Sequence, residues 1–230
     1  MRRAFAATIA CLALLGLAPA SLDSQLVLQR YELTLGDLVA PKTMIFSYSV
    51  SQLGSTDIEQ VHRIYRSGLD VRDETLSVQG IALKPKIVGF GQREDRYALA
   101  RLAPRSAAYA MLFIRMVRDG SHEDYLYEAT PLEPASSGFV VTHVTIDGIA
   151  YLPREIDFQT AGATAHGQGK IIYGKSDKYW VPMFVSIDAQ VDGKPARERI
   201  VWSDYRFPRM LPAATFVPPE PLPHATLPPI

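Results

Sequence analysis

The sequence predicts a mainly β protein of the α+β class, in which one N-terminal helix precedes an antiparallel meander of about nine to eleven strands. Three observations support this fold class: a long alternating segment at 179–191, turn signals between the apolar segments, and helical spacing in one place only. Sheets of more than about 10 strands tend to curl or split. We therefore expect a curved sheet or an incomplete barrel, with a concave side that the helix covers or a ligand fills.

The helix is predicted over residues 25–39. Leu28, Tyr31, Leu35 and Leu38 recur there at spacings of three and four residues, which places them on one face of a helix.

The strands are predicted from alternation with a period of two. In residues 179–191, Val181, Met183, Val185 and Ile187 fall on one face, and polar side chains lie between them. Further strands are expected at 44–50, 62–66, 70–78, 111–117, 125–129, 139–146, 169–174 and 197–207, with one more through Ile156 and Phe158.

Residues 62–74 hold many charged side chains and form a predicted hairpin. A three-residue loop at 67–69 would pair opposite charges across it, which stabilises facing strands. The pairs in that register are Arg66–Asp70, Arg63–Asp73 and His62–Glu74. This register places Arg63 on one face with Tyr65, so a buried Arg63 is a candidate anchor for a polar head group. A catalytic role for the cluster is the alternative to the structural ladder.

The ends of the chain differ from its middle. Residues 1–20 have the three parts of a secretory signal: Arg2 and Arg3, an apolar stretch, and a small-x-small cleavage site at Ala18–Ala20. Cys11, the only cysteine, lies within that stretch, and lipid attachment there is the alternative to a discarded residue. We therefore expect a periplasmic or secreted protein that is cleaved near Ala20.

The mature chain is expected to form a single domain over 21–207, followed by a proline-rich tail over 208–230. That tail holds eight of the 17 prolines. Lys plus Arg (24) balance Asp plus Glu (24), and loss of the two leader arginines leaves a net charge near −2. This charge predicts no nucleic-acid partner, and no later segment is long and apolar enough for a transmembrane helix.

The octet GKIIYGKS at 169–176 matches the phosphate-loop pattern through Gly169, Gly174, Lys175 and Ser176. A phosphate loop joins a buried strand to a helix whose amide groups receive the phosphates. Here strand-forming residues occupy the loop positions, and an alternating segment follows in place of a helix. We therefore interpret the match as false and predict a strand between the two glycines.

Other chemical signatures are weak. No pair of histidines has metal-ligand spacing, no G-x-S-x-G elbow occurs, and we expect neither a metal nor a cofactor. Aromatic side chains in strands are explained by core packing or, on a curved sheet, by a pocket for an acyl chain. The candidate ligand-binding residues are Arg63, Tyr65, Phe113, Tyr127, Trp180 and Trp202.

The order of these elements resembles the periplasmic lipoprotein-sorting carriers of the LolA/LolB-like superfamily. The resemblance lies in the leader, the helix and the strand segments VTHVTIDGIAYLPREIDFQTA, GKIIYG, YWVPMFVSIDAQV and ARERIVWSDYRFP. It covers roughly residues 25–216 and suggests a distant member. It implies a half-barrel closed by helices, an apolar cavity for lipid chains and no catalytic step.

The leading hypothesis is therefore an exported, non-enzymatic protein that binds an apolar, lipid-like ligand and carries lipid or lipoprotein in the cell envelope. Two alternatives stay open. The first is an envelope interaction or scaffold protein with a filled core and a protein partner. The second is a secreted hydrolase, whose catalytic side chains would have to converge in a cleft.

Overall fold

The computed structural model describes residues 19–54, 57–119, 122–133, 138–161 and 165–219. The leader is predicted over residues 1–20, and residues 1–18 of it lie outside the described residues. The elements in chain order are α2 (Pro19–Gly36), β1 (Thr43–Leu53), β2 (Ile58–Ser67), β3 (Asp70–Val78), β4 (Ile81–Gln92), α3 (Leu99–Leu102), β5 (Tyr109–Asp119), β6 (His122–Pro131), β7 (Phe139–Asp147), β8 (Pro153–Ala161), β9 (Ala165–Ser176), β10 (Tyr179–Val191), β11 (Lys194–Arg206) and the 3-10 helix η1 (Ala213–Phe216).

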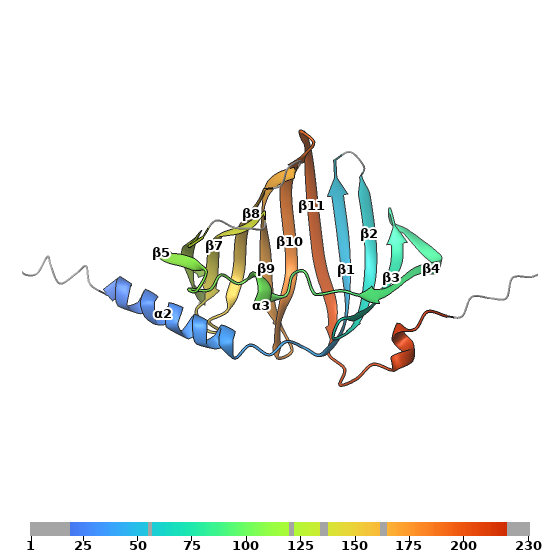
Figure 1. Ribbon diagram of the computed structural model, residues 1–230, viewed down its shortest axis with the longest axis horizontal. Helices are drawn as coiled ribbons and strands as arrows, with labels where there is room; N and C mark the ends of the chain where they lie inside the picture. Colours follow the sequence, from blue (N-terminus) through green and yellow to red (C-terminus); the bar gives the residue numbers. More distant parts are fainter. Residues whose placement is uncertain (1–18, 55–56, 120–121, 134–137, 162–164, 220–230) are drawn as a thin grey trace, which may run out of the picture.

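The predicted fold class is confirmed, because the strands form one antiparallel, 11-stranded sheet that does not close into a barrel. The strand order is β4-β3-β2-β1-β11-β10-β9-β8-β7-β6-β5. Two meanders, β1–β4 and β5–β11, are thus joined by the pairing of β1 with β11. This order places β4 and β5, which follow each other in sequence, at opposite edges of the sheet (Figure 1).

The connection between β4 and β5 must therefore travel the full width of the sheet. Residues 93–108, which we call the crossover, run across one face and include the single-turn helix α3 (Figure 1). We call this face the covered face and the opposite one the open face. Tyr173 donates from its hydroxyl to the carbonyl oxygen of Tyr97 in the crossover (3.1 Å), which holds the connection on the sheet.

Helix α2 covers the part of the same face that β5–β9 form. The helix buries Val27, Tyr31 and Leu35, which recur every four residues along it. On the sheet, Tyr127 is fully buried, and its hydroxyl donates to the carbonyl oxygen of Ser24 in α2 (2.7 Å). The helix predicted over 25–39 is therefore confirmed, but it spans Pro19–Gly36 and ends before Val39.

One cross-strand row shows how the alternating pattern builds the core. Each residue in this row pairs with the next on the neighbouring strand: Phe113, Tyr127, Val144, Ile156, Ile171, Val185, Ile200 and Val50. The five members from Tyr127 to Val185 are fully buried, Ile200 is 8% exposed, and Val50 is only half-buried. Burial is thus complete beneath α2 and weaker toward β1.

The predicted register of the 62–78 hairpin is wrong. Ser67 pairs with Asp70, so the turn has two residues, Gly68 and Leu69, in place of the expected three. Gly68 adopts a positive φ of 59°, a conformation that suits glycine in tight hairpin turns. The shift leaves none of the three predicted charge pairs directly opposite, and Arg63 faces Glu74 instead.

The expected tail begins as an ordered segment. The Thr43 hydroxyl donates to the carbonyl oxygen of Pro208, and η1 lies against β3. Residues beyond 219 lie outside the described part of the chain.

Candidate functional site

A cavity of about 470 Å³ lies between the covered face and the crossover. Residues 38–41, between α2 and β1, and residues 94–101 of the crossover contribute to its walls. The rest of the lining comes from the β2–β3 turn and from the adjacent strands β2, β1, β11 and β10. The strand residues that line it are Met44, Phe46, Arg66, Trp180, Val181, Pro182, Trp202 and Tyr205.

Two β-bulges shape the sheet beside this cavity. In β11, a register shift opposite residues 45–47 of β1 accompanies a positive φ of 57° at Asp204. The extra residue brings Trp202 and Tyr205, which are three positions apart, into the same cavity wall. A second bulge follows Pro182 in β10, where a proline is tolerated inside a sheet.

Two of the aromatic side chains that line the cavity have their polar atoms bonded to backbone carbonyl groups. The Trp180 indole donates to the oxygen of Pro153 (2.7 Å), and the Tyr205 hydroxyl donates to the oxygen of Pro182 (2.7 Å). The Trp202 ring packs edge-on against Tyr97 of the crossover, with centroids 5.2 Å apart. Because these polar atoms are already bonded, the aromatic walls favour an apolar occupant.

Arg66 places a cation in this largely apolar wall and is only 8% exposed. Its Nη1 donates to the carbonyl oxygen of Arg93 in the crossover (2.8 Å), whereas its buried Nε has no hydrogen-bond partner. Burial lowers the pKa of Arg66, and the charge of Asp95 partly opposes that shift. Arg66 is therefore a buried cation with unused hydrogen-bonding capacity beside the cavity.

The other charged side chains of the lining belong to the crossover. Glu94 pairs with Arg101, and both side chains are more than half exposed, at 69% and 53%. Asp95 accepts a hydrogen bond from the backbone N–H of Tyr97 (3.0 Å). The lining contains no Ser, Thr, Cys, Lys or His among the described residues, so it offers no side-chain nucleophile of those types.

A polar cluster beside the cavity ties the crossover to the sheet. The Asp73 carboxylate contacts Nδ1 of His62 (2.8 Å) and accepts a hydrogen bond from Arg93 (2.9 Å). Burial acts to raise the pKa of Asp73, but hydrogen bonds from His62 and Arg93 bring it below its ordinary value. The Tyr48 ring stacks on His62 with centroids 4.7 Å apart, and burial followed by the Asp73 charge raises the Tyr48 pKa to about 12.

The structure separates the six sequence-predicted ligand residues into three groups. Trp180 and Trp202 line the cavity. Phe113 and Tyr127 pack against each other in the part of the sheet that α2 covers, with ring centroids 5.6 Å apart. Arg63 and Tyr65 lie on the open face, because side chains alternate along β2 and it is His62, Ile64 and Arg66 that face the crossover.

Sequence reasoning therefore missed Arg66 and the crossover. Each face of β2 carries apolar side chains, Val61 and Tyr65 on one and Ile64 on the other, so alternation alone does not show which face is buried. Gly68 was a signal for the two-residue turn and hence for the register of the hairpin, but it does not indicate which face of β2 the crossover covers.

The octet at 169–176 lies within β9, so the predicted strand is confirmed, but it extends to Ser176 and the turn begins at Asp177. Gly169 is required by packing, because a Cβ there would lie 2.6 Å from Cζ of Phe158 and 2.5 Å from the oxygen of Ser186. Two packed strands, β8 and β10, therefore explain one glycine of the apparent phosphate motif.

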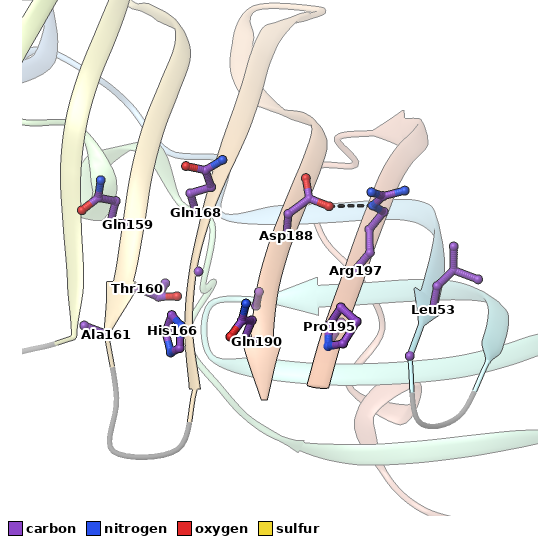
Figure 2. A pocket seen from close by; sticks show the side chains of 14 residues that line it. Leu53, Gln159, Thr160, Ala161, His166, Gln168, Asp188, Gln190, Pro195 and Arg197 are labelled. Carbon is purple, nitrogen blue, oxygen red and sulfur yellow. Dashed lines mark hydrogen bonds and ion pairs between the residues drawn. The ribbon is translucent and has the colours of Figure 1, made fainter. Parts of the chain in front are cut away.

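A larger hollow of about 1040 Å³ lies near the ends of strands β8–β11, and its lining mixes polar and apolar residues that are mostly exposed. Figure 2 shows a row of side chains across these strands, in which Gln159, Gln168, Asp188 and Arg197 occupy paired positions. Asp188 and Arg197 form an exposed ion pair (2.6 Å). Because none of these side chains is buried, this hollow lacks the desolvated groups of a built binding site.

Within the described ranges, no three His, Cys, Asp or Glu side chains gather closely enough to hold a metal ion. Among the helices that the structure describes, none is both long and apolar enough to cross a membrane.

No protein-family model matches the sequence, and no curated protein matches it closely enough to count as a relative. Three solved structures are similar to the fold. A DUF1329 family protein from Desulfovibrio piger has 10% identity and a TM-score of 0.46, covering 84% of this chain and 96% of its own. A LolA superfamily protein from Nitrosomonas europaea has 11% identity and a TM-score of 0.37, covering 83% and 97%.

The third structure is a domain from Vibrio parahaemolyticus that is described as an outer membrane lipoprotein-sorting protein. It has 14% identity and a TM-score of 0.44, covering 83% of this chain and 94% of its own. The similarity of these three structures to this chain concerns the fold alone.

Proposed function

We propose that this protein is an exported, non-enzymatic carrier that binds an apolar, lipid-like ligand in the cavity beneath the crossover. The observation that carries the proposal is a largely apolar cavity on the covered face with aromatic walls, in which the polar atoms of Trp180 and Tyr205 already bond to the backbone. Its volume of about 470 Å³ is in the usual range of ligand pockets, about 300–1,000 Å³.

The chemistry of the lining supports binding over catalysis. A covalent mechanism needs a nucleophile beside a base, and acid–base catalysis needs titratable groups that reach a substrate. The acids of the lining are instead engaged with Arg101 and with a backbone N–H. A hydrophobic pocket with few polar groups is the arrangement that holds an acyl chain without changing it.

Export and carriage in the cell envelope rest on the sequence. The residues that form the predicted secretory signal support a location of the mature protein in the periplasm or outside the cell. An apolar ligand would need a carrier there, because its chain is poorly soluble in water.

The experiment uses the tryptophans as reporters. The chain holds two of them, and both line the cavity. Purified protein would be delipidated and titrated with an apolar fluorescent probe, with energy transfer from tryptophan as the signal. Native mass spectrometry before delipidation would show whether a lipid copurifies. We expect saturable transfer and a copurified lipid.

A pair of substitutions locates the binding. Ala98→Phe places a ring in the crossover wall of the cavity and should abolish the transfer. Ala107→Phe makes the same change at an exposed position of the crossover outside the lining and should leave it intact. Equal binding by both variants, or no binding by the natural protein, would contradict the proposal.

A further inference from the structure

We propose that the ligand of this cavity is a single-chain amphiphile with an anionic head group, and that Arg66 binds the head while the chain lies along the aromatic wall. This inference rests on the proposed function and narrows it to one class of ligand. It combines the size of the cavity with the unsatisfied cation in its wall.

The volume limits the number of chains. A methylene group occupies roughly the volume of one water molecule in the liquid, about 30 Å³. A cavity of about 470 Å³ therefore accommodates one chain of roughly 15 carbon atoms. Beneath α2 the covered face offers no extension, because Tyr127, Val144 and Ile156 are fully buried there. An adjoining hollow of about 480 Å³ shares Leu38, Val39 and Trp180 with the cavity, but its lining includes the charged side chains of Asp37, Lys175 and Lys178, which suit an acyl chain less well.

The shape of the cavity suits an extended chain. Arg66 lies on β2, and Trp180 lies on β10, three strand positions away across β1 and β11. At about 4.8 Å between neighbouring strands, this separation is roughly 14 Å. A chain anchored at Arg66 can thus run across the strands and reach the tryptophans.

Arg66 supplies the head-group site. A buried cation is strongly destabilising when no anion compensates it. Among the described residues, no carboxylate lies within ion-pair distance of Arg66, and Glu94 is paired with Arg101. Asp95 is near enough to act on Arg66 electrostatically but makes no ion pair with it.

The hydrogen bonds of Arg66 leave donors for a ligand. Both of its contacts use Nη1, one to the oxygen of Arg93 (2.8 Å) and a long one to the oxygen of Gly68 (3.5 Å). Nε has no partner. Nε is itself enclosed by protein atoms, so a head group in the cavity would meet Nη2, which makes no hydrogen bond to any described residue. A hydrogen bond from this charged donor to an anionic oxygen is charge-assisted and therefore strong.

The test compares three probes on delipidated protein by tryptophan fluorescence: hexadecanoate, its methyl ester, and a two-chain anionic phosphatidylglycerol. We expect hexadecanoate to bind with one molecule per protein. The ester should bind about 10- to 100-fold more weakly, because it loses a charge-assisted pair. The two-chain lipid should bind more weakly than hexadecanoate, since its second chain has no space.

Arg66→Met tests the anchor directly. It should weaken hexadecanoate about 10- to 100-fold and leave the ester unchanged, so that the two probes bind alike. Arg72→Met is the matched control, because Arg72 also has a buried Nε without a partner but pairs with Glu74 on the open face. That variant should keep the preference for the acid. If Arg66→Met does not fold, Arg66→Lys should fold and retain part of the preference for the acid over the ester.

The outcomes separate the two proposals. Equal binding of acid and ester by the natural protein, or tighter binding of the two-chain lipid, overturns the inference and leaves the apolar-ligand function standing. Failure of all three probes to alter tryptophan fluorescence overturns the proposed function itself.

Discussion

The covered face has two parts that are built from the same kind of alternating strands but pack differently. We call the part beneath α2 the filled part and the part beneath the crossover the cavity part. Beneath α2, inward-facing side chains of β6–β9 such as Tyr127, Val144, Ile156 and Ile171 are fully buried and fill the space. Beneath the crossover, the side chains of β10, β11, β1 and β2 leave a cavity of about 470 Å³. A helix delivers a large side chain at every turn, as Val27, Tyr31 and Leu35 do here, whereas the crossover contributes small residues such as Ala98 and Ala100. The cover, more than the sheet, decides whether a face becomes a core or a binding site.

The largest expected loss of stability follows the truncation of a buried side chain beneath α2. Ile156→Ala removes a fully buried side chain between neighbours that cannot collapse, and it should lower the free energy of unfolding by about 3–4 kcal/mol. Met44→Ala, in the cavity wall, should lower it by less than half as much, because that side chain already borders empty space. Chemical denaturation measures both, and equal losses would erase the distinction between the two parts.

A smaller loss of stability is expected when a methyl group is added to the closely packed strand β9. Gly169→Ala would place a methyl group 2.6 Å from the ring of Phe158, and overpacking of this kind costs about 1–3 kcal/mol. Thermal unfolding checks the loss. Gly89→Ala is the control, because a Cβ at that strand position meets nothing within 4 Å. If both substitutions had the same effect, close packing around β9 would not explain the glycine.

Within the described part of the chain, three hydrogen bonds join α2 to the crossover, and the one from Tyr31 is buried. Tyr31 is fully buried and donates from its hydroxyl to the oxygen of Pro104 (2.6 Å). Tyr31→Phe should lower the free energy of unfolding by about 1–2 kcal/mol. It should also raise amide hydrogen exchange in the crossover more than in β6–β9. Uniform exchange throughout the sheet would show that this bond does not act on the crossover selectively.

The smallest expected effect is a pH dependence of stability that arises from Asp73, in the polar cluster beside the cavity. The pKa of Asp73 is lowered in the folded protein, so its carboxylate stabilises the fold above about pH 4, the ordinary value for aspartate. That contribution is lost as pH falls through the lower folded pKa. The stability of the natural protein should therefore fall more steeply with acid than that of Asp73→Asn. Asp188→Asn, at an exposed pair, should leave the slope unchanged, and parallel slopes for Asp73→Asn would argue against the cluster.

Local pattern predicted most of the elements. Alternation identified the strands from Met44 to Phe207, and leucine spacing identified the helix, because both signals are contained in neighbouring residues. The strand Ile81–Gln92 was missed, since Gly89, Gly91 and a Lys-Pro-Lys segment interrupt its alternation. These are features that protect an exposed edge strand from pairing.

The candidate site was predicted in part. Trp180 and Trp202 lie at the cavity, as a pocket-lining role requires, whereas Arg63 lies on the face opposite to Arg66. A one-residue error in a turn changes which side chains meet across a hairpin. The choice between the faces of β2 also needed a distant segment, the crossover, to show which face is covered.

The sequence by itself determined the alternation, the helix, the turns and the false character of the phosphate-loop match, because each depends on neighbours along the chain. Only the tertiary structure decided that β1 joins β11, which sends β4 and β5 to opposite edges and stretches the crossover over the sheet. That long-range pairing creates the cavity and buries Arg66 in its wall. No local period encodes it, since its two strands are separated by most of the chain.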